Sequence, residues 1–285
     1  MNLLLISMIV MNSLGQSTHI ETNKSMTSRE VVELIKAKLT CKWATETVDT
    51  FKAGDPDEEI GGIACTFMAT VDVLKRAAEL GCNLIITHEP TYYNHLDHKD
   101  LLENDPVYAA KQAIIEENNL VVFRFHDHWH RTRPDGIYVG MVDKLQWNPY
   151  LVKGRRNMFM LPEFTLAEVT EHMKEIFPEA IIRVIGDPDL VVDKAVFSAG
   201  APGSASHIRH LQDEETKLII IGEAPEWESL AYVNDASQAG LPKAMIILGH
   251  TVSEEAGMDY CATWLRTFIH EVPVHFIPAG DPFHQ

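Results

Sequence analysis

Three short segments of the chain combine histidine with acidic residues, and each follows an apolar run. They are THEP at residues 87–90, HDHWH at 126–130 and GHTVSE at 249–254. The preceding runs CNLIIT, LVVFRF and AMIIL have the pattern of strands buried on both faces of a parallel sheet. Ligands bind at the carboxyl ends of such strands, so we expect the three segments to meet at one site.

The first segment places His88 beside Glu89. Neighbouring side chains of an extended chain point in different directions, so two adjacent metal ions can each take one of them. The alternative is a polar turn in which Pro90 ends the strand.

The second segment repeats histidine at every second position. If the chain stays extended, His126, His128 and His130 share one face. Three protonated imidazoles would repel each other there, whereas neutral imidazoles that coordinate a metal avoid this cost. We therefore expect at least one of them to be a ligand, and Asp127 is a further candidate. The alternative is a mixture of structural and exposed histidines.

The third segment spaces His250 and Glu254 four residues apart. At the start of a helix this spacing puts both on one face, where they can reach the same metal pair. The alternative is a capping box formed by Thr251 and Glu254.

Together the segments offer a mixed set of imidazole and carboxylate donors. Such a set suits zinc, manganese or iron rather than magnesium or calcium. Two divalent ions roughly 3.5–4 Å apart lower the pKa of a bridging water and supply hydroxide at neutral pH. The segments therefore predict two divalent metal ions and hydrolytic chemistry.

The elements that must position these residues alternate along the chain. Strands are expected at residues 63–69, 82–87, 120–125, 181–184, 194–198, 218–221 and 244–248, and helices at 27–39, 71–80, 106–117, 166–176, 204–211, 229–240 and 254–270. This alternation is typical of an α/β fold with mainly parallel sheets covered by helices.

The strand–helix–strand plan occurs twice. Residues 65–90 and 195–225 share this order, and both stretches close with a glutamate and a proline. The repetition predicts two related α/β lobes, at residues 26–150 and 151–285, with the metal site in the cleft between them.

Composition narrows the class of protein. The 285 residues carry a formal net charge of −17, which disfavours binding to nucleic acid because polyanions require clustered lysine and arginine. The four cysteines show no CxxC spacing, so neither a zinc ribbon nor a thioredoxin-like motif is expected.

The N-terminus has an apolar run at residues 3–11 that is too short to span a bilayer. We expect no stable membrane association. Residues 1–15 resemble a signal peptide without a basic start, and 16–25 a polar tail. A cleaved leader implies export to the periplasm. An extra helix or a misassigned start codon is the alternative, and implies a cytoplasmic protein.

From about Thr27 onward the chain resembles the Nif-three-like family, some members of which carry the name GTP cyclohydrolase I type two. The family pattern IITHHP, HTxxD, TGE and GHxxxE corresponds here to IITHEP (85–90), HDHWH (126–130), IGEAP (221–225) and GHTVSE (249–254). The resemblance implies two α/β lobes around a dinuclear metal centre, and a toroidal homohexamer built from trimers.

Two ligand positions of the family pattern are exchanged in this chain. Glu89 replaces a histidine, and His130 replaces an aspartate. The resemblance implies that His88 and His250 hold one metal, that Glu89 and His130 hold the other, and that Glu254 bridges them. Asp127 or His126 can replace His130 in this scheme.

The function we predict is a metal-dependent hydrolase, cyclohydrolase-like by its family resemblance, that acts on a small, anionic or nucleotide-like substrate. Arg131 and Arg133 follow the second segment and can pair with an anionic group. Surface arginines in a turn are the alternative. The competing function is a metal-binding oligomeric scaffold or regulatory protein without turnover.

Overall fold

Four strands from the first half of the chain and one from its C-terminal end build a five-stranded sheet with the order β1-β4-β3-β2-β10. In this computed structural model, which describes residues 26–283, the strands are β1 (Phe51–Ala53), β2 (Ile63–Thr66), β3 (Leu84–Thr87), β4 (Val121–Arg124) and β10 (Val274–Phe276). Strands β4, β3, β2 and β10 are parallel, and β1 pairs with β4 in the antiparallel sense.

A second five-stranded sheet has the order β5-β7-β8-β9-β6. Its strands are β5 (Met158–Thr165), β6 (Arg183–Ile185), β7 (Val191–Ser198), β8 (Leu218–Ile221) and β9 (Ala244–Ile247). Strands β7, β8 and β9 are parallel, with antiparallel edges at β5 and β6. Both sheets therefore have three central parallel strands and an antiparallel edge strand beside the third, which confirms two related α/β lobes.

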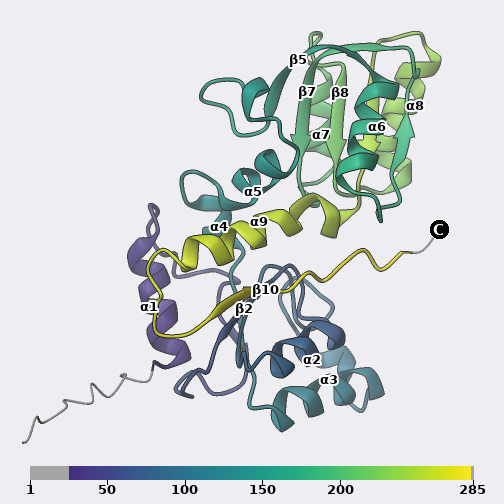
Figure 1. Ribbon diagram of the computed structural model, residues 1–285. Helices are drawn as coiled ribbons and strands as arrows, with labels where there is room; N and C mark the ends of the chain where they lie inside the picture. The colour runs from purple at the N-terminus through teal and green to yellow at the C-terminus, as the bar shows by residue number, and fades with distance from the viewer. Residues whose placement is uncertain (1–25, 284–285) are drawn as a thin grey trace, which may run out of the picture.

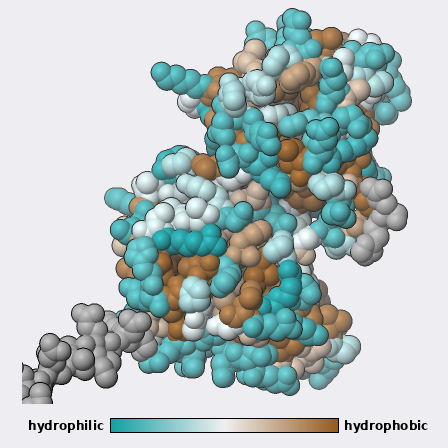
Figure 2. Space-filling view, viewed as in Figure 1, coloured by the Kyte–Doolittle hydropathy of each residue, from teal (hydrophilic) through white to brown (hydrophobic). Residues whose placement is uncertain are grey.

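Helices cover both sheets and join the lobes (Figure 1). They are α1 (Ser28–Lys38), α2 (Val71–Glu79), α3 (Pro106–Glu117), α4 (Asp127–Arg131), α5 (Gly136–Lys144), α6 (Leu166–Ile176), α7 (Ser204–Leu211), α8 (Ala231–Gln238) and α9 (His250–Leu265), with short helical turns at Asp100–Leu102, Asn148–Tyr150 and Glu226–Leu230. The capping box expected at Thr27 and Glu30 is present. In space-filling form, hydrophilic residues cover much of the visible face of both lobes (Figure 2).

Helix α9 lies between the two lobes, against α5 (Figure 1). The two helices approach closely because both carry glycine at the contact. A Cβ atom on Gly140 would collide with the backbone of Ala256, and one on Gly257 would collide with Ile137. The Trp129 indole donates a hydrogen bond to the carbonyl of Gly257 at 3.1 Å. Helix α9 is thereby fixed to the segment that carries HDHWH.

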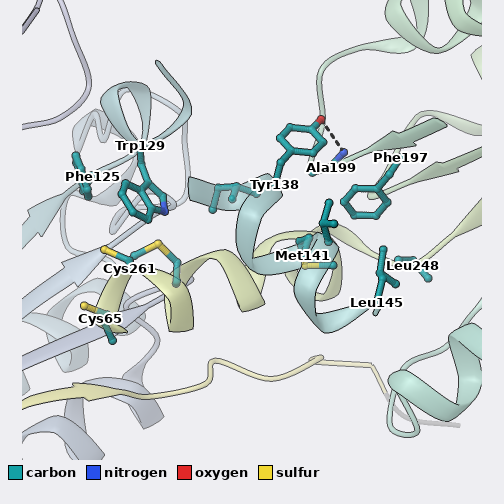
Figure 3. Close-up of a cluster of buried hydrophobic side chains, with 14 of the residues drawn as sticks. Cys65, Phe125, Trp129, Tyr138, Met141, Leu145, Phe197, Ala199, Leu248 and Cys261 are labelled. Carbon is teal, nitrogen blue, oxygen red and sulfur yellow. Dashed lines mark hydrogen bonds between the residues drawn. The ribbon is translucent and has the colours of Figure 1, made fainter. Parts of the chain in front are cut away.

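The interior around α9 is continuous between the lobes (Figure 3). Tyr138 of α5 reaches the second sheet, where its hydroxyl accepts a hydrogen bond from the backbone of Ala199 at 3.3 Å. On the other side, Cys65 of β2 and Cys261 of α9 are both fully buried. Burial raises the pKa of the Cys261 thiol, as expected for a small apolar side chain rather than a reactive one.

The last strand departs from the expected division at residue 150. After α9 the chain returns to the first lobe, where β10 pairs with β2. The expected second lobe of residues 151–285 thus contributes its final strand to the first sheet. The predicted signal peptide at residues 1–15 lies outside the described residues. No helix within residues 26–283 combines the length and hydropathy needed to cross a bilayer.

Candidate metal centre

The three predicted segments meet at the carboxyl ends of strands from both lobes. His88 and Glu89 follow β3, HDHWH follows β4, and His250 begins α9 just after β9. Two groups of residues there could each hold a metal ion, because their donor atoms lie within 4.8 Å of one another inside each group. One group is His88, His126 and His130, and the other is His88, Glu89 and Glu254. The donor set is therefore a single cluster between the lobes.

His88 stands at the centre of this cluster and is completely buried. Its Nδ1 lies 3.2 Å from the carbonyl oxygen of Phe125, so Nδ1 carries the proton and donates it. The remaining nitrogen, Nε2, is buried and has no hydrogen-bond partner among residues 26–283. A buried polar atom left unpaired costs free energy, and a lone pair directed into a cluster of donors is what a metal ion satisfies.

The HDHWH segment is helical rather than extended, which corrects the expectation that three histidines share one face. His126, just before α4, and His130 within it lie one turn apart, with ring centroids 5.1 Å from each other. Both rings also approach His88, at 4.6 Å and 5.0 Å. Helical spacing therefore delivers two histidines to the cluster and turns His128 away.

His128 and Asp127 serve the structure instead. His128 Nε2 accepts a hydrogen bond from the backbone of Ala44 at 2.9 Å, and its Nδ1 lies 2.6 Å from Asp49. Both imidazole nitrogens are thus occupied. Asp127 accepts hydrogen bonds from Thr47 and its neighbour Val48. Neither residue is placed as a ligand.

Asp49 is the reason that HDHWH forms a helix. Its buried carboxylate accepts the backbone N–H groups of His126, Asp127 and His128 at 2.7–2.9 Å, besides the His128 side chain. Three orphan N–H groups at a helix N-terminus are thereby satisfied. Sequence reasoning missed this residue because it lies far upstream in an irregular segment.

Glu254 is the carboxylate shared by most of the cluster. Its Oε2 lies 3.1 Å from His250 Nε2 and 3.6 Å from His88 Nε2, and its Oε1 lies 3.7 Å from His130 Nε2. The side chain fits into a space left by Gly200, where a Cβ atom would come within 2.5 Å of Oε1. Helix α9 begins after Gly249 without a side-chain cap, so Glu254 does not form the capping box considered above.

Glu89 faces the same cluster from the end of β3. Its Oε1 lies 3.6 Å from His126 Nε2 and 3.7 Å from His250 Nε2. Its other oxygen lies 3.5 Å from Arg124, a fully buried residue of β4 whose Nε also donates to the carbonyl of His88 at 3.1 Å. Arg124 therefore holds the orientation of the His88–Glu89 pair.

Two further carboxylates hold imidazoles from outside the cluster. Glu223 lies 3.1 Å from His250 Nδ1, and Asp135 lies 3.4 Å from His130 Nδ1 and pairs with Arg156 at 2.7 Å. Each leaves the Nε2 atom of its histidine facing the cluster, as carboxylates behind metal-binding histidines do. The duplication contained the signal for Glu223, because Glu223 follows β8 as Glu89 follows β3.

The residues of the cluster differ in the direction in which their surroundings shift the pKa. Burial and the neighbouring His126 and His130 hold the pKa of His88 well below its usual range. Burial also disfavours charge on His250, but hydrogen bonds to Glu223 and Glu254 outweigh it and raise the pKa of His250 to about 10. Burial raises the pKa of Glu89 to about 7. The protein environment therefore favours a neutral imidazole at His88 and a protonated one at His250.

The two arginines considered as anion contacts are both exposed. Arg133 donates from Nη1 to the carbonyls of His130, Arg131 and Thr132 at 2.8–2.9 Å, and so closes the C-terminal end of α4. Arg131 is exposed on the outside of the same turn. The alternative reading, arginines of a structured turn, agrees with the position of Arg133.

We predict that Asp49→Ala lowers the free energy of unfolding by about 3 kcal/mol, because buried N–H groups and His128 lose their acceptor. Asp55→Ala, in an exposed turn, serves as the matched control and should change the free energy of unfolding by less than about 0.5 kcal/mol. Chemical denaturation followed by circular dichroism measures both. Equal stability of the two variants would contradict this role of Asp49.

Comparisons with known proteins agree with this architecture. A family model described as Duf34/NIF3 (NGG1p interacting factor 3) matches residues 23–282. A relative from Clostridium acetobutylicum, named GTP cyclohydrolase 1 type 2 homolog, is 23% identical over 78% of this chain and 82% of its own.

The crystal structure of a hypothetical protein from Staphylococcus aureus has a TM-score of 0.71 at 15% identity, covering 92% of this chain and 99% of that one. A Bacillus cereus protein related to NIF3 has a TM-score of 0.70 at 14% identity, covering 91% and 99%. The chain therefore belongs to the DUF34/NIF3 family.

Proposed function

We propose that the cluster holds two divalent metal ions and that the protein is a metal-dependent hydrolase. The observation that carries the proposal is the buried Nε2 of His88, which has no hydrogen-bond partner among residues 26–283 and lies among carboxylate and imidazole donors. One nitrogen lone pair holds one ion, so the second ion is proposed from the donors that remain, which are more than one ion needs. A single ion would leave part of this donor set unsatisfied. The bridging role falls to Glu254, because its two oxygens face different histidines.

The donor types favour particular metals. Imidazole nitrogens and carboxylate oxygens in one site suit zinc, manganese or iron. We propose His88, Glu89, His130, His250 and Glu254 as ligands, with His126 as an additional donor on the same side as His130. Glu223 and Asp135 fix which nitrogen of His250 and His130 is available to a metal.

The chain leaves room for a substrate beside this centre. A cavity of about 450 Å³ has Glu89 and His250 in its wall, and this volume falls within the range of small-molecule sites, about 300–1,000 Å³. When bound, divalent ions would supply Lewis acidity and lower the pKa of water. The protein residues would bind and orient the substrate and hold the ions at a fixed position.

The proposed class of substrate rests on the size of this cavity, on the chemistry of divalent ions and on the name of a relative. The name of the Clostridium acetobutylicum relative supports hydrolytic chemistry on a nucleotide-like molecule. We propose a small anionic substrate of that kind. The homohexamer implied by the family resemblance stays a prediction.

Metal content tests the centre directly. We expect the wild-type protein to bind about two ions per chain, and Glu89→Ala and His130→Ala each to bind fewer, since each loses a ligand. The exposed His270 is the matched control, and His270→Ala should retain the wild-type content. Elemental analysis of dialysed protein measures the ratio. Unchanged content in both ligand variants would refute the assignment.

Proton release tests the charges of the metal-free site. Ligand atoms must lose their protons when a metal binds, so we expect metal uptake to release more protons at about pH 6 than at about pH 8. The pKa of His250, about 10, means that its proton is still released at the higher pH, whereas Glu89, with a pKa of about 7, contributes mainly at the lower one. Titration calorimetry in buffers of different ionisation enthalpy counts these protons. A pH-independent count would contradict the prediction.

Turnover separates the hydrolase from a metal-binding scaffold. We expect metal-loaded protein to hydrolyse at least one class among phosphoesters, amides and cyclic nucleotides, and Glu254→Gln to lose at least about 100-fold in rate. Chelator-treated protein and His270→Ala are the controls. Bound metals without any turnover in the zinc, manganese and iron forms would favour the scaffold.

A further inference from the structure

The cavity beside the metal centre has walls from both lobes. Besides Glu89 and His250, its lining includes Phe67, Tyr93 and Lys111. Lys111 is the one lysine or arginine among the lining residues, all of which lie in the described part of the chain. In a protein with a net charge of −17, a lone buried ammonium group at this position requires an explanation.

Lys111 lies on α3 and is 4% exposed. Its Nζ donates one hydrogen bond, to the carbonyl of Thr91 at 2.8 Å, and stands 4.8 Å from the centre of the Tyr93 ring. The buried Asp97 carboxylate acts on this charge electrostatically, but it pairs with Lys52 and Arg124, and no carboxylate of residues 26–283 lies within 4.0 Å of Lys111 Nζ. An ammonium group has three donors, and burying its charge with one hydrogen bond and no carboxylate in direct contact is costly. Burial lowers the pKa of Lys111 to about 8.

Asp97 holds the loop that covers Lys111 through hydrogen bonds and an ion pair. Asp97 accepts the backbone N–H groups of Thr91 and Tyr92 at 2.7 and 2.8 Å and pairs with Lys52 at 3.3 Å. Tyr93 has a φ of 60°, in the left-handed region that non-glycine residues rarely adopt. The backbone of the loop is therefore held beside Lys111, and the half-exposed ring of Tyr93 lies over the ammonium group.

Two helix N-termini add positive potential to the same cavity. Thr70 and Val71, at the start of α2, line it, as do His250 and Thr251, at the start of α9. The Thr70 hydroxyl already accepts one N–H group of α2, that of Val73. The helix dipole and the first N–H groups of each helix still favour an anion at such positions. Helix α2 has nine residues and α9 has sixteen. Lys111 and two helix starts thus converge on one space.

We infer that this cavity binds an anionic group of the substrate, a phosphate or a carboxylate, through Lys111 and the starts of α2 and α9. The reacting part of the substrate then lies against Glu89 and His250, and Phe67 contributes an apolar wall for a ring. This inference rests on the proposed function for the presence of a substrate. It reassigns to Lys111 the anion contact that the sequence suggested for Arg131 and Arg133.

Titration calorimetry with phenylphosphonate and benzoate tests the inference, with benzyl alcohol as the uncharged comparison. Both metal-loaded and chelator-treated full-length protein are used, because the chelator-treated form excludes direct coordination to a metal. Lys111→Gln removes the charge but keeps an N–H donor for the Thr91 carbonyl. We expect it to weaken binding of at least one anion by about 10- to 100-fold and to leave binding of benzyl alcohol unchanged.

Lys99→Met is the matched control, since it removes the same charge from an exposed lysine over the neighbouring Tyr92 ring. It should retain wild-type affinity for the anions. Equal affinity of Lys111→Gln and Lys99→Met, or no binding of either anion to the wild-type protein, would overturn the inference. The phosphonate and benzoate arms distinguish a phosphate subsite from a carboxylate subsite.

A crystal structure of the wild-type protein with phenylphosphonate decides the matter even if Lys111→Gln does not fold. The inference requires the phosphonate within hydrogen-bond distance of Lys111 Nζ, and any other position, or none, refutes it. Metal content separates this result from the proposed function. If Lys111→Gln keeps its metals and its anion affinity, the subsite fails while the metal centre stands.

Discussion

The close packing of α9 against α5 is the contact on which the candidate site depends. His250 and Glu254 come from the helix that follows the second sheet, whereas His88, Glu89 and the HDHWH histidines belong to the first lobe. The donors meet because Gly140 and Gly257 allow the two helices to touch through their backbones. A larger side chain at either position would move Glu254 away from His88 and divide the cluster into two incomplete halves. The site is therefore a product of how the lobes are joined, and neither lobe contains it alone.

The two lobes share a plan, yet they contribute unequally to the centre. Glu89 and Glu223 follow corresponding strands, and His126 and His250 follow the next strand in each lobe. In the first lobe the glutamate faces several imidazoles, whereas in the second it stays behind His250 and holds its Nδ1. The same position of a repeated motif thus places a carboxylate in the cluster in one lobe, and in the other lobe places a carboxylate that holds the orientation of His250.

Long apolar runs made much of this arrangement predictable from the sequence. The strands before His88, His126 and His250 were expected within a few residues of their observed bounds, and the positions of these side chains at strand ends follow from them. The extended conformation predicted for HDHWH was wrong, because the helix there depends on Asp49. This residue lies 77 residues before His126, and no motif in the sequence around it indicates the contact. Lys111 resembles any surface lysine of an amphipathic helix, since the loop that buries it comes from residues 91–97. Strand β10 has only three residues, too few for periodicity to reveal.

The return of β10 to the first sheet also bears on the order in which the protein assembles. Chains emerge from the ribosome starting at the N-terminus, and early segments tend to fold first. Here the first sheet lacks one of its strands until residues 274–276 have been made, long after its other four strands and after the whole second sheet. The second lobe can therefore complete its sheet during synthesis, whereas the first lobe closes last. Since α9 immediately precedes β10, closure of that sheet and arrival of Glu254 beside His88 belong to the same late step.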